Sequence, residues 1–147
     1  LMKKLLNRIS NVAKKVLKIE KTINIARANG ANEIALLYCV SSYPAKMSDF
    51  NLNNIAFLKR RFKCKIGLSD HSKDNRIAAA AVIAGAEIFE KHIALEGQKI
   101  VHDIKFSLKG KELKTYRDEI NLSYQLLGEK KFKRNLTGSV GFGLLFS

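Results

Sequence analysis

The sequence predicts an α/β fold built on parallel strands, and three observations lead to that prediction. Helix-like and strand-like segments alternate along the 147 residues, the strand-like segments are almost continuously apolar, and polar groups follow where each of them ends. Continuous apolar runs are typical of strands covered on both faces, as in a parallel sheet. Strand–helix alternation with short links indicates right-handed crossovers between parallel strands. The length suits one domain.

The first two elements are read from a periodic pattern followed by an apolar run. Residues 3–29 carry apolar side chains at steps of three and four, which predicts an amphipathic helix with a break near Lys18. Gly30 is expected to stop it. The run over 34–40 predicts the first strand, and the segment 41–44, which holds the only proline, ends that strand.

The rest of the chain repeats the alternation. Asp49 or Asn51 is expected to cap the next helix. The predicted elements are then a helix over 52–62, a strand over 65–68, a helix over 77–84, a strand within 86–95 and a helix over 110–127. Three strands cannot close a barrel, so this architecture is expected to be part of a larger α/β fold.

Composition narrows the functional class only slightly. The chain has 27 Lys and Arg against 13 Asp and Glu, a net charge of +14, but its basic residues are not interleaved with aromatic ones. This favours solvated lysines on helices over a nucleic-acid platform. Cys39 and Cys64 form no CxxC motif and are expected to be buried thiols in a reducing compartment. With no signal-peptide pattern and no run of 18 apolar residues, we expect a cytoplasmic protein outside the membrane.

Polar groups gather where the predicted strands end. The second strand runs into Ser69-Asp70-His71 and the third into Glu90-Lys91-His92, with Asp103 in the loop that follows. In parallel α/β folds, function gathers at the carboxyl ends of the strands. Because neighbouring strands lie about 4.8 Å apart, His71 and His92 could share one metal ion or one substrate oxygen. A functional edge is favoured, with satisfied structural histidines as the alternative.

Three stretches then carry a resemblance to a known family. They are "LLYCVSSYPAKMSDFNLNNIAFLKRRF", "IGLSDHS" and "GAEIFEKHIAL", in this order and spacing. Together they resemble the sialic acid synthase family, which includes the N-acetylneuraminate, legionaminate and pseudaminate synthases. The similarity runs over about 19–134. It implies the last three strand–helix units of a (β/α)8 TIM barrel.

The resemblance also implies a reaction. Phosphoenolpyruvate would add through its methylene carbon to the open-chain aldehyde of an N-acylated amino sugar, water would add at the other alkene carbon, and phosphate would leave. A divalent metal, with Mn²⁺ expected and Mg²⁺ as the alternative, would polarise the aldehyde. Family members are homodimers. The chain is thus expected to be a phosphoenolpyruvate-dependent enzyme that makes sialic or related nonulosonic acids.

Several residues match family positions with direct roles. His71 and His92 match the two histidines that bind the metal, and Ser69 matches a serine that holds phosphoenolpyruvate. Asp103 matches a carboxylate that binds sugar hydroxyls. His102 matches no family role and is expected to be a solvated loop histidine.

Other matched residues are expected around the substrates. Tyr43 and Ser41 match positions where an aromatic and a polar side chain face the substrate. Asp70 and Glu90, taken as the catalytic carboxylates, are expected to orient the histidines. Lys91 is expected to offset phosphate or carboxylate charge, and pairing with a carboxylate within the sheet is an equal alternative.

The ends of the chain depart from the family pattern. Residues 1–18 predict a basic helix where the family has a strand, and 135–147 form an uncharged, mainly apolar tail without a family counterpart. Two interpretations stay open: a fragment or degraded gene product, which we favour, or one piece of a split enzyme. An unpaired strand edge at 34–40 predicts poor solubility or a loose fold for the isolated chain.

Two other functions are weighed against the synthase. One is a non-catalytic remnant or binding module whose +14 charge favours anionic partners. The other is a different aldolase-like barrel that uses phosphoenolpyruvate or a metal, which is weakened because the three motifs match one family in order.

Overall fold

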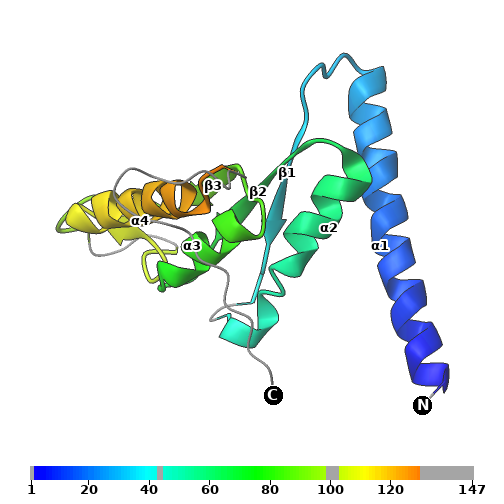
Figure 1. Cartoon of the computed structure of the whole chain (residues 1–147), viewed down its shortest axis with the longest axis horizontal. Helices are drawn as coiled ribbons and strands as arrows, with labels where there is room; N and C mark the ends of the chain where they lie inside the picture. The colour runs from blue at the N-terminus through cyan, green and yellow to red at the C-terminus, as the bar shows by residue number, and fades with distance from the viewer. Residues whose placement is uncertain (1, 43–44, 99–102, 130–147) are drawn as a thin grey trace, which may run out of the picture.

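A three-stranded parallel sheet lies at the centre of the molecule, in the order β1-β2-β3. Each strand is joined to the next by a helix, so that consecutive strands are neighbours (Figure 1). The elements are β1 (Ala35–Cys39), α2 (Asn53–Phe62), β2 (Lys65–Asp70), α3 (Arg76–Ile83) and β3 (Ile88–Lys91). The predicted parallel sheet with helical crossovers is confirmed.

Two longer helices stand at opposite ends of this unit (Figure 1). They are α1 (Met2–Ala28) and α4 (Lys111–Leu127). The structure is a computed structural model that describes residues 2–42, 45–98 and 103–129, with the backbone alone for 2–9. Tyr43, His102 and the predicted tail 135–147 therefore lie outside the described residues.

The register brings the carboxyl ends of the three strands to one edge. β1 pairs with β2 from Ala35 opposite Lys65 to Cys39 opposite Ser69. β2 pairs with β3 up to Asp70, which lies opposite Lys91. Each strand therefore ends beside its neighbour, and the loops that follow leave from the same edge.

The two faces of the sheet differ in what covers them. Side chains alternate along a strand, and Leu36, Tyr38, Ile66, Leu68 and Phe89 point to the face on which the helices pack. We call this the helix-covered face. Its core is completed by Phe50, Ile55, Ile77, Ala81 and Ala86. Ile66 and Leu68 are 0% exposed, so this face holds the hydrophobic core.

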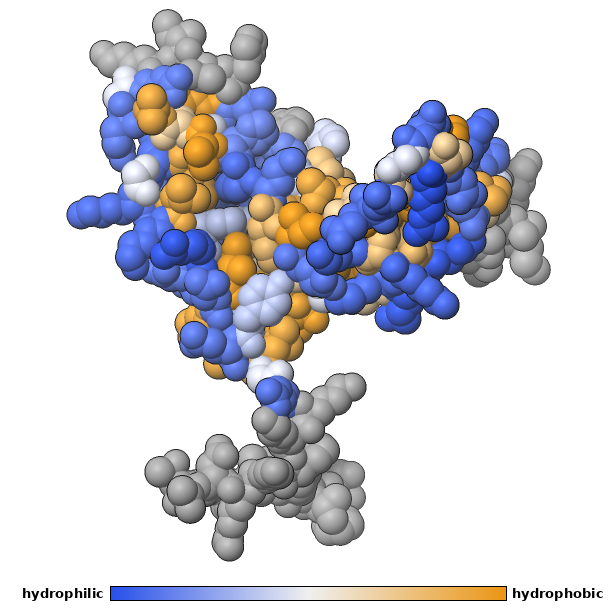
Figure 2. Space-filling model, turned by 90° about the horizontal axis from the view of Figure 1, so that it is seen from above, coloured by the Kyte–Doolittle hydropathy of each residue, from blue (hydrophilic) through white to orange (hydrophobic). Residues whose placement is uncertain are grey.

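The opposite face, which we call the open face, carries the alternate residues of the same strands. These are Ala35, Leu37, Cys39, Gly67, Ser69, Ile88 and Glu90, and Leu37 is 39% exposed. Apolar residues also reach the surface in the middle of the molecule, between the α1 end and the α4 end (Figure 2). Continuous apolar strands predicted cover on both faces; within the described part of the chain, helices cover one face.

Local signals at helix ends gave mixed results. Gly30 at φ +92° ends α1 as predicted, and Gly85 at φ +100° follows α3 in the same way, because glycine adopts this left-handed conformation without a steric penalty. The predicted break near Lys18 is absent, and α1 is continuous. The predicted caps Asp49 and Asn51 are wrong: Asp49 ends a 3-10 turn (Met47–Asp49), and α2 starts without a side-chain cap.

The third predicted strand divides into two. β3 ends at Lys91, and β4 (Ile93–Ala94) leaves the sheet to pair in parallel with β5 (Leu108–Lys109). The pairing was not predicted, because two-residue strands carry no periodic signal. It begins one residue after His92, whose carbonyl accepts a hydrogen bond from the Leu108 N–H. The return of the chain at Leu108 therefore fixes the backbone of His92.

Candidate functional site

The two predicted metal ligands meet at the carboxyl edge of the sheet. His71 is the first residue after β2 and His92 the first after β3. Their Nε2 atoms lie 3.2 Å apart, and their ring centroids are 5.1 Å apart with a tilt of 44°. His71 is buried and His92 is exposed, so the pair opens to solvent on the His92 side.

This spacing suits two ligands of one metal ion. Two imidazole nitrogens about 2.1 Å from one ion, at an angle between about 90° and 109°, lie about 3.0–3.4 Å from each other. The observed 3.2 Å falls within that range. Among the described residues no cluster of three or more His, Cys, Asp or Glu side chains suits a metal. An imidazole pair favours a transition-metal ion over Mg²⁺.

A hydroxyl and a carboxylate lie beside the imidazoles on the open face. Ser69 and Glu90 face each other across β2 and β3, and the Ser69 hydroxyl donates a 2.7 Å hydrogen bond to Glu90 Oε1. Ser69 precedes His71 by two residues, and Glu90 precedes His92 by two. The alternation of a strand thus places all four on the same side of the sheet.

Cys39 joins this group, which sequence reasoning missed. Its Sγ lies 3.6 Å from Nδ1 of His71 and 3.6 Å from the hydroxyl of Ser41. The prediction of a buried Cys39 is wrong, because its position in the pleat of β1 places it on the open face, exposed. Leu36, Tyr38 and Val40 pack on the core, so Cys39, which alternates with them, falls on the opposite face. Cys64 is partly buried.

Asp70 and Lys91 lie on the other side. They alternate with Ser69 and Glu90, and the Lys91 ammonium is 3.2 Å from Asp70 Oδ2 on the helix-covered face. Their side chains are 0% and 5% exposed. For Lys91 the sequence leaves contact with substrate charge and pairing with a carboxylate within the sheet as equal alternatives. The structure shows the pairing.

A pocket of about 660 Å³ opens beside His71. Its lining combines His71 with the segment 72–76, residues Ala45 and Met47 after β1, and Phe106 and Glu119. Arg76, the first residue of α3, forms a bidentate contact with Asp74, and its hydrogen bonds lower the pKa of the Asp74 carboxyl to about 2. The pocket therefore places a charged, hydrogen-bonded loop next to His71.

The remaining predicted residues are less closely grouped. Ser41 is exposed and lies at the same edge through its contact with Cys39. Asp103 is exposed, at φ +67°, and its carbonyl accepts a hydrogen bond from the Ser107 hydroxyl. The structure thus places Asp103 in the turn before β5 and does not show its side chain against the histidines. Tyr43 lies outside the described residues.

Comparison with known proteins adds a family to this geometry. The family model described as the NeuB family matches residues 7–132, most of the chain. The chain belongs to the NeuB family. Membership agrees with the partial (β/α)8 barrel inferred from the sequence. The three parallel strands and their polar edge lie where the motifs predicted them.

Two similar proteins of known name are synthases of acidic sugars. An N,N'-diacetyllegionaminic acid synthase of Campylobacter jejuni is 37% identical over 113 residues, 76% of this chain and 34% of that protein. An N-acetylneuraminate-9-phosphate synthase of Drosophila melanogaster is 38% identical over 97 residues, 65% of this chain and 26% of that protein. The chain therefore spans about a third or less of these two relatives.

A solved structure agrees with the fold. The N-acetylneuraminic acid synthetase of Leptospira borgpetersenii, crystallised with citrate, superimposes with a TM-score of 0.72 at 36% identity. The match covers 81% of this chain and 41% of that chain. The three strand–helix units of this NeuB-family chain are thus part of a TIM-barrel architecture.

Proposed function

We propose that the open-face site serves the condensation of phosphoenolpyruvate with the open-chain aldehyde of an N-acylated amino sugar. The observation that carries this proposal is the 3.2 Å approach of the His71 and His92 Nε2 atoms at the edge where two parallel strands end. Membership in the NeuB family supports it, because relatives of this family are named as sialic, legionaminic and pseudaminic acid synthases.

His71 and His92 would hold one divalent ion, with Mn²⁺ proposed and Mg²⁺ less suited to imidazole ligands. The chemistry that a bound ion would supply is polarisation of the aldehyde oxygen of the sugar. Cys39 lies on the Nδ1 side of His71 and also contacts the Ser41 hydroxyl. A partner there that accepts the Nδ1–H keeps the Nε2 lone pair directed at the ion.

Ser69 and Glu90 act on phosphoenolpyruvate and water. In the reaction the methylene carbon of phosphoenolpyruvate bonds to the aldehyde carbon, water adds at the adjoining carbon, and phosphate leaves from that carbon. The Ser69 hydroxyl, which donates to Glu90 in the free site, is placed to donate to a substrate oxygen instead. Glu90 Oε1 then accepts a proton from the attacking water.

Other expectations for the complete reaction extend this proposal. Asp103 binding sugar hydroxyls, Tyr43 facing the substrate, a homodimer and a cytoplasmic location stay predictions. In the described part of the chain, no helix has the length and apolarity to cross a membrane.

The test is metal binding followed by turnover. Titration of the full chain with Mn²⁺ in a calorimeter should show binding that His71→Ala and His92→Ala each abolish. His102→Ala is the matched control, because it removes the third histidine of the sequence. Phosphate release from phosphoenolpyruvate with N-acetylmannosamine then tests the reaction. Unchanged Mn²⁺ affinity in both single variants would contradict the proposal.

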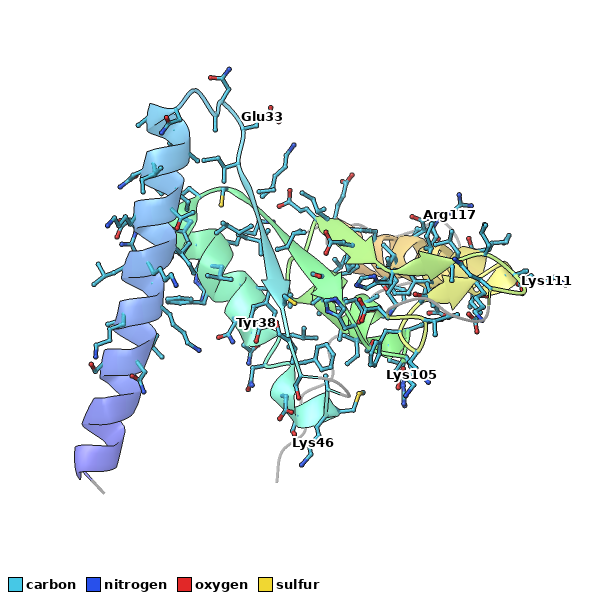
Figure 3. All side chains as sticks on the ribbon, turned by 180° about the vertical axis from the view of Figure 1, so that it is seen from behind. Glu33, Tyr38, Lys46, Lys105, Lys111 and Arg117 are labelled. Atoms are coloured by element: carbon cyan, nitrogen blue, oxygen red, sulfur yellow. The ribbon has the colours of Figure 1, made fainter. Side chains whose placement is uncertain are left out.

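A binding module for anionic partners is the second candidate, and the +14 charge favours it. Figure 3 shows labelled basic side chains on separate parts of the molecule, with Lys46 distant from Lys111 and Arg117. Binding of single-stranded nucleic acid of any sequence, weakening steeply with salt, together with no Mn²⁺ binding would favour this function.

A further inference from the structure

A buried ion pair lies behind the two histidines, on the helix-covered face. Asp70 and Lys91 are partners in the β2–β3 register, and Asp70 Oδ2 lies 3.2 Å from Lys91 Nζ. With side chains 0% and 5% exposed, the two charges are shielded from water. Each of them immediately precedes a histidine in the chain, because Asp70 is followed by His71 and Lys91 by His92.

Both charges also hold the backbone on the far side of His71. Asp70 Oδ1 accepts a 2.8 Å hydrogen bond from the Ser72 N–H, and Lys91 Nζ donates to the Ser72 carbonyl. Residue 72 is therefore tied to both members of the ion pair. His71 lies between Asp70 and Ser72, so its backbone is fixed from both sides.

Tyr116 covers the pair on the side of α4. Tyr116 from α4 is 4% exposed, packs with Ala78 and Leu108, and places its ring 5.5 Å from Lys91 Nζ. Burial, and after it the negative charge of Asp70, raises the pKa of the Tyr116 hydroxyl, which therefore stays neutral. In such an environment of low dielectric, either charge alone is costly and the pair is favourable only in a well-defined geometry.

A buried ion pair is weak evidence for added stability. Replacement of both charges by neutral groups of similar volume is often neutral or stabilising, whereas removal of one charge is strongly destabilising. The better-supported use of such pairs is to select one arrangement among several of similar energy. Here, the arrangement that the pair selects is the alignment of the end of β2 with the end of β3.

We propose that Asp70 and Lys91 are positioning residues that set the spacing of the His71 and His92 imidazoles from the opposite face of the sheet. The inference rests on the proposed function, because it concerns the two groups assigned to the metal. It gives Lys91 a role without substrate contact. It also makes the relative position of the imidazoles depend on a cross-strand contact on the other face of the sheet.

The primary test needs no metal and uses the full chain. NMR should show a nuclear Overhauser contact between the Hε1 protons of His71 and His92, whose Nε2 atoms lie 3.2 Å apart. His102→Gln in every sample removes the remaining histidine signal. The variants are Asp70→Asn, Lys91→Met and the double variant. The thermal midpoint of each is measured in parallel.

The expected pattern separates positioning from stability. Each single variant should lose thermal stability because one buried charge is left alone, and the double variant should recover most of it. The Overhauser contact should nevertheless be lost in the double variant, and its Mn²⁺ affinity should fall about 10–100-fold, as for loss of groups that orient metal ligands. Lys91→Arg, which keeps the charge, should retain the contact.

Lys59→Met is the matched control. Lys59 forms an ion pair with Glu87, the residue before β3. The Lys59 side chain is 45% exposed and the Glu87 side chain 38%. Its removal should change neither the Overhauser contact nor Mn²⁺ affinity, because an exposed pair contributes little to geometry or stability.

Three results would overturn the inference: a wild-type contact in the double variant, no contact in the wild-type chain, or a double variant as unstable as the single variants. The reaction and the positioning role can fail separately. If the wild-type chain releases no phosphate but the double variant loses the Overhauser contact, the proposed reaction is overturned and the positioning role stands.

Discussion

The two faces of the three-stranded sheet in this NeuB-family chain carry different kinds of side chain. On the helix-covered face, β2 contributes Ile66 and Leu68, both fully buried, and then a charged residue, Asp70, held by an ion pair. On the open face the same strand contributes Gly67 and Ser69, followed by His71. The core side chains and the polar groups of the proposed site are thus separated by one residue of register, and a slip of one residue would exchange them.

The largest expected effect comes from the helix-covered face. Leu68→Ala should lower the free energy of unfolding by about 2–5 kcal/mol, because it leaves a cavity where a 0% exposed side chain packs against α2 and α3. Urea unfolding followed by circular dichroism measures it. Leu37→Ala, at a 39% exposed position of the open face, is the control and should cost far less. Equal losses would contradict the division into two faces.

A smaller loss is expected at one crowded point of the open face. A Cβ at Gly67 would lie 2.4 Å from the Ile88 carbonyl oxygen and 2.5 Å from Leu37 Cδ2. Gly67→Ala should therefore cost about 1–3 kcal/mol in unfolding free energy, since the strands must move apart. Adding Leu37→Ala relieves the side-chain contact alone, so most of the loss should persist. Full recovery in that double variant would show that the backbone carbonyl is not limiting.

The polar contact of the open face should contribute less. Ser69→Ala removes the 2.7 Å hydrogen bond to Glu90, and water can reach the freed carboxylate because Glu90 is exposed. We expect a loss of about 1 kcal/mol in unfolding free energy. Ser48→Ala, which removes an exposed 3.4 Å contact to Asp49, is the control and should be close to neutral. A loss at Ser69 as large as that at Leu68 would mean that this face, too, supports the core.

The smallest effect is expected in the exposed loop beside the pocket. Hydrogen bonds from Arg76 lower the pKa of Asp74 from 3.8 to about 2. A lowered pKa in the folded state stabilises above the unfolded value, and that contribution is lost as the pH falls from about 4 to about 2. Carboxyl NMR titration should show the Asp74 midpoint rising in Arg76→Met. Asp118, whose pKa is lowered first by a hydrogen bond from Lys114, should not move. An unchanged Asp74 midpoint would show that Arg76 is not the cause.

Local patterns predicted most of this architecture. The apolar run over 34–40 and the steps of three and four along α1 and α4 are strong signals, because each repeats over many residues. The short elements were missed: the β4–β5 pairing depends on two residues per strand. The caps of α2 were also misplaced, since Asp49 and Asn51 are used in the turn that precedes the helix.

Within the site, the motifs predicted which residues take part, and the strand pattern indicates on which face they lie. The motifs named His71, His92, Ser69 and Glu90, and the alternation of a strand would by itself have placed them on one side, with Asp70 and Lys91 on the other. The burial of Lys91 could not be inferred that way, because a lysine at a strand end is usually solvated. It depends on Tyr116, 25 residues further along the chain, packing over it.

The sequence by itself determined the order of the main elements and the chemical groups at the strand ends, because both follow from local periodicity and residue type. Only the tertiary structure decided how those groups meet. The 3.2 Å between the two imidazoles, the contact of Cys39 with His71 and the ion pair behind them arise from the register between strands. Register is fixed by packing between residues far apart in the chain, and no local pattern encodes it.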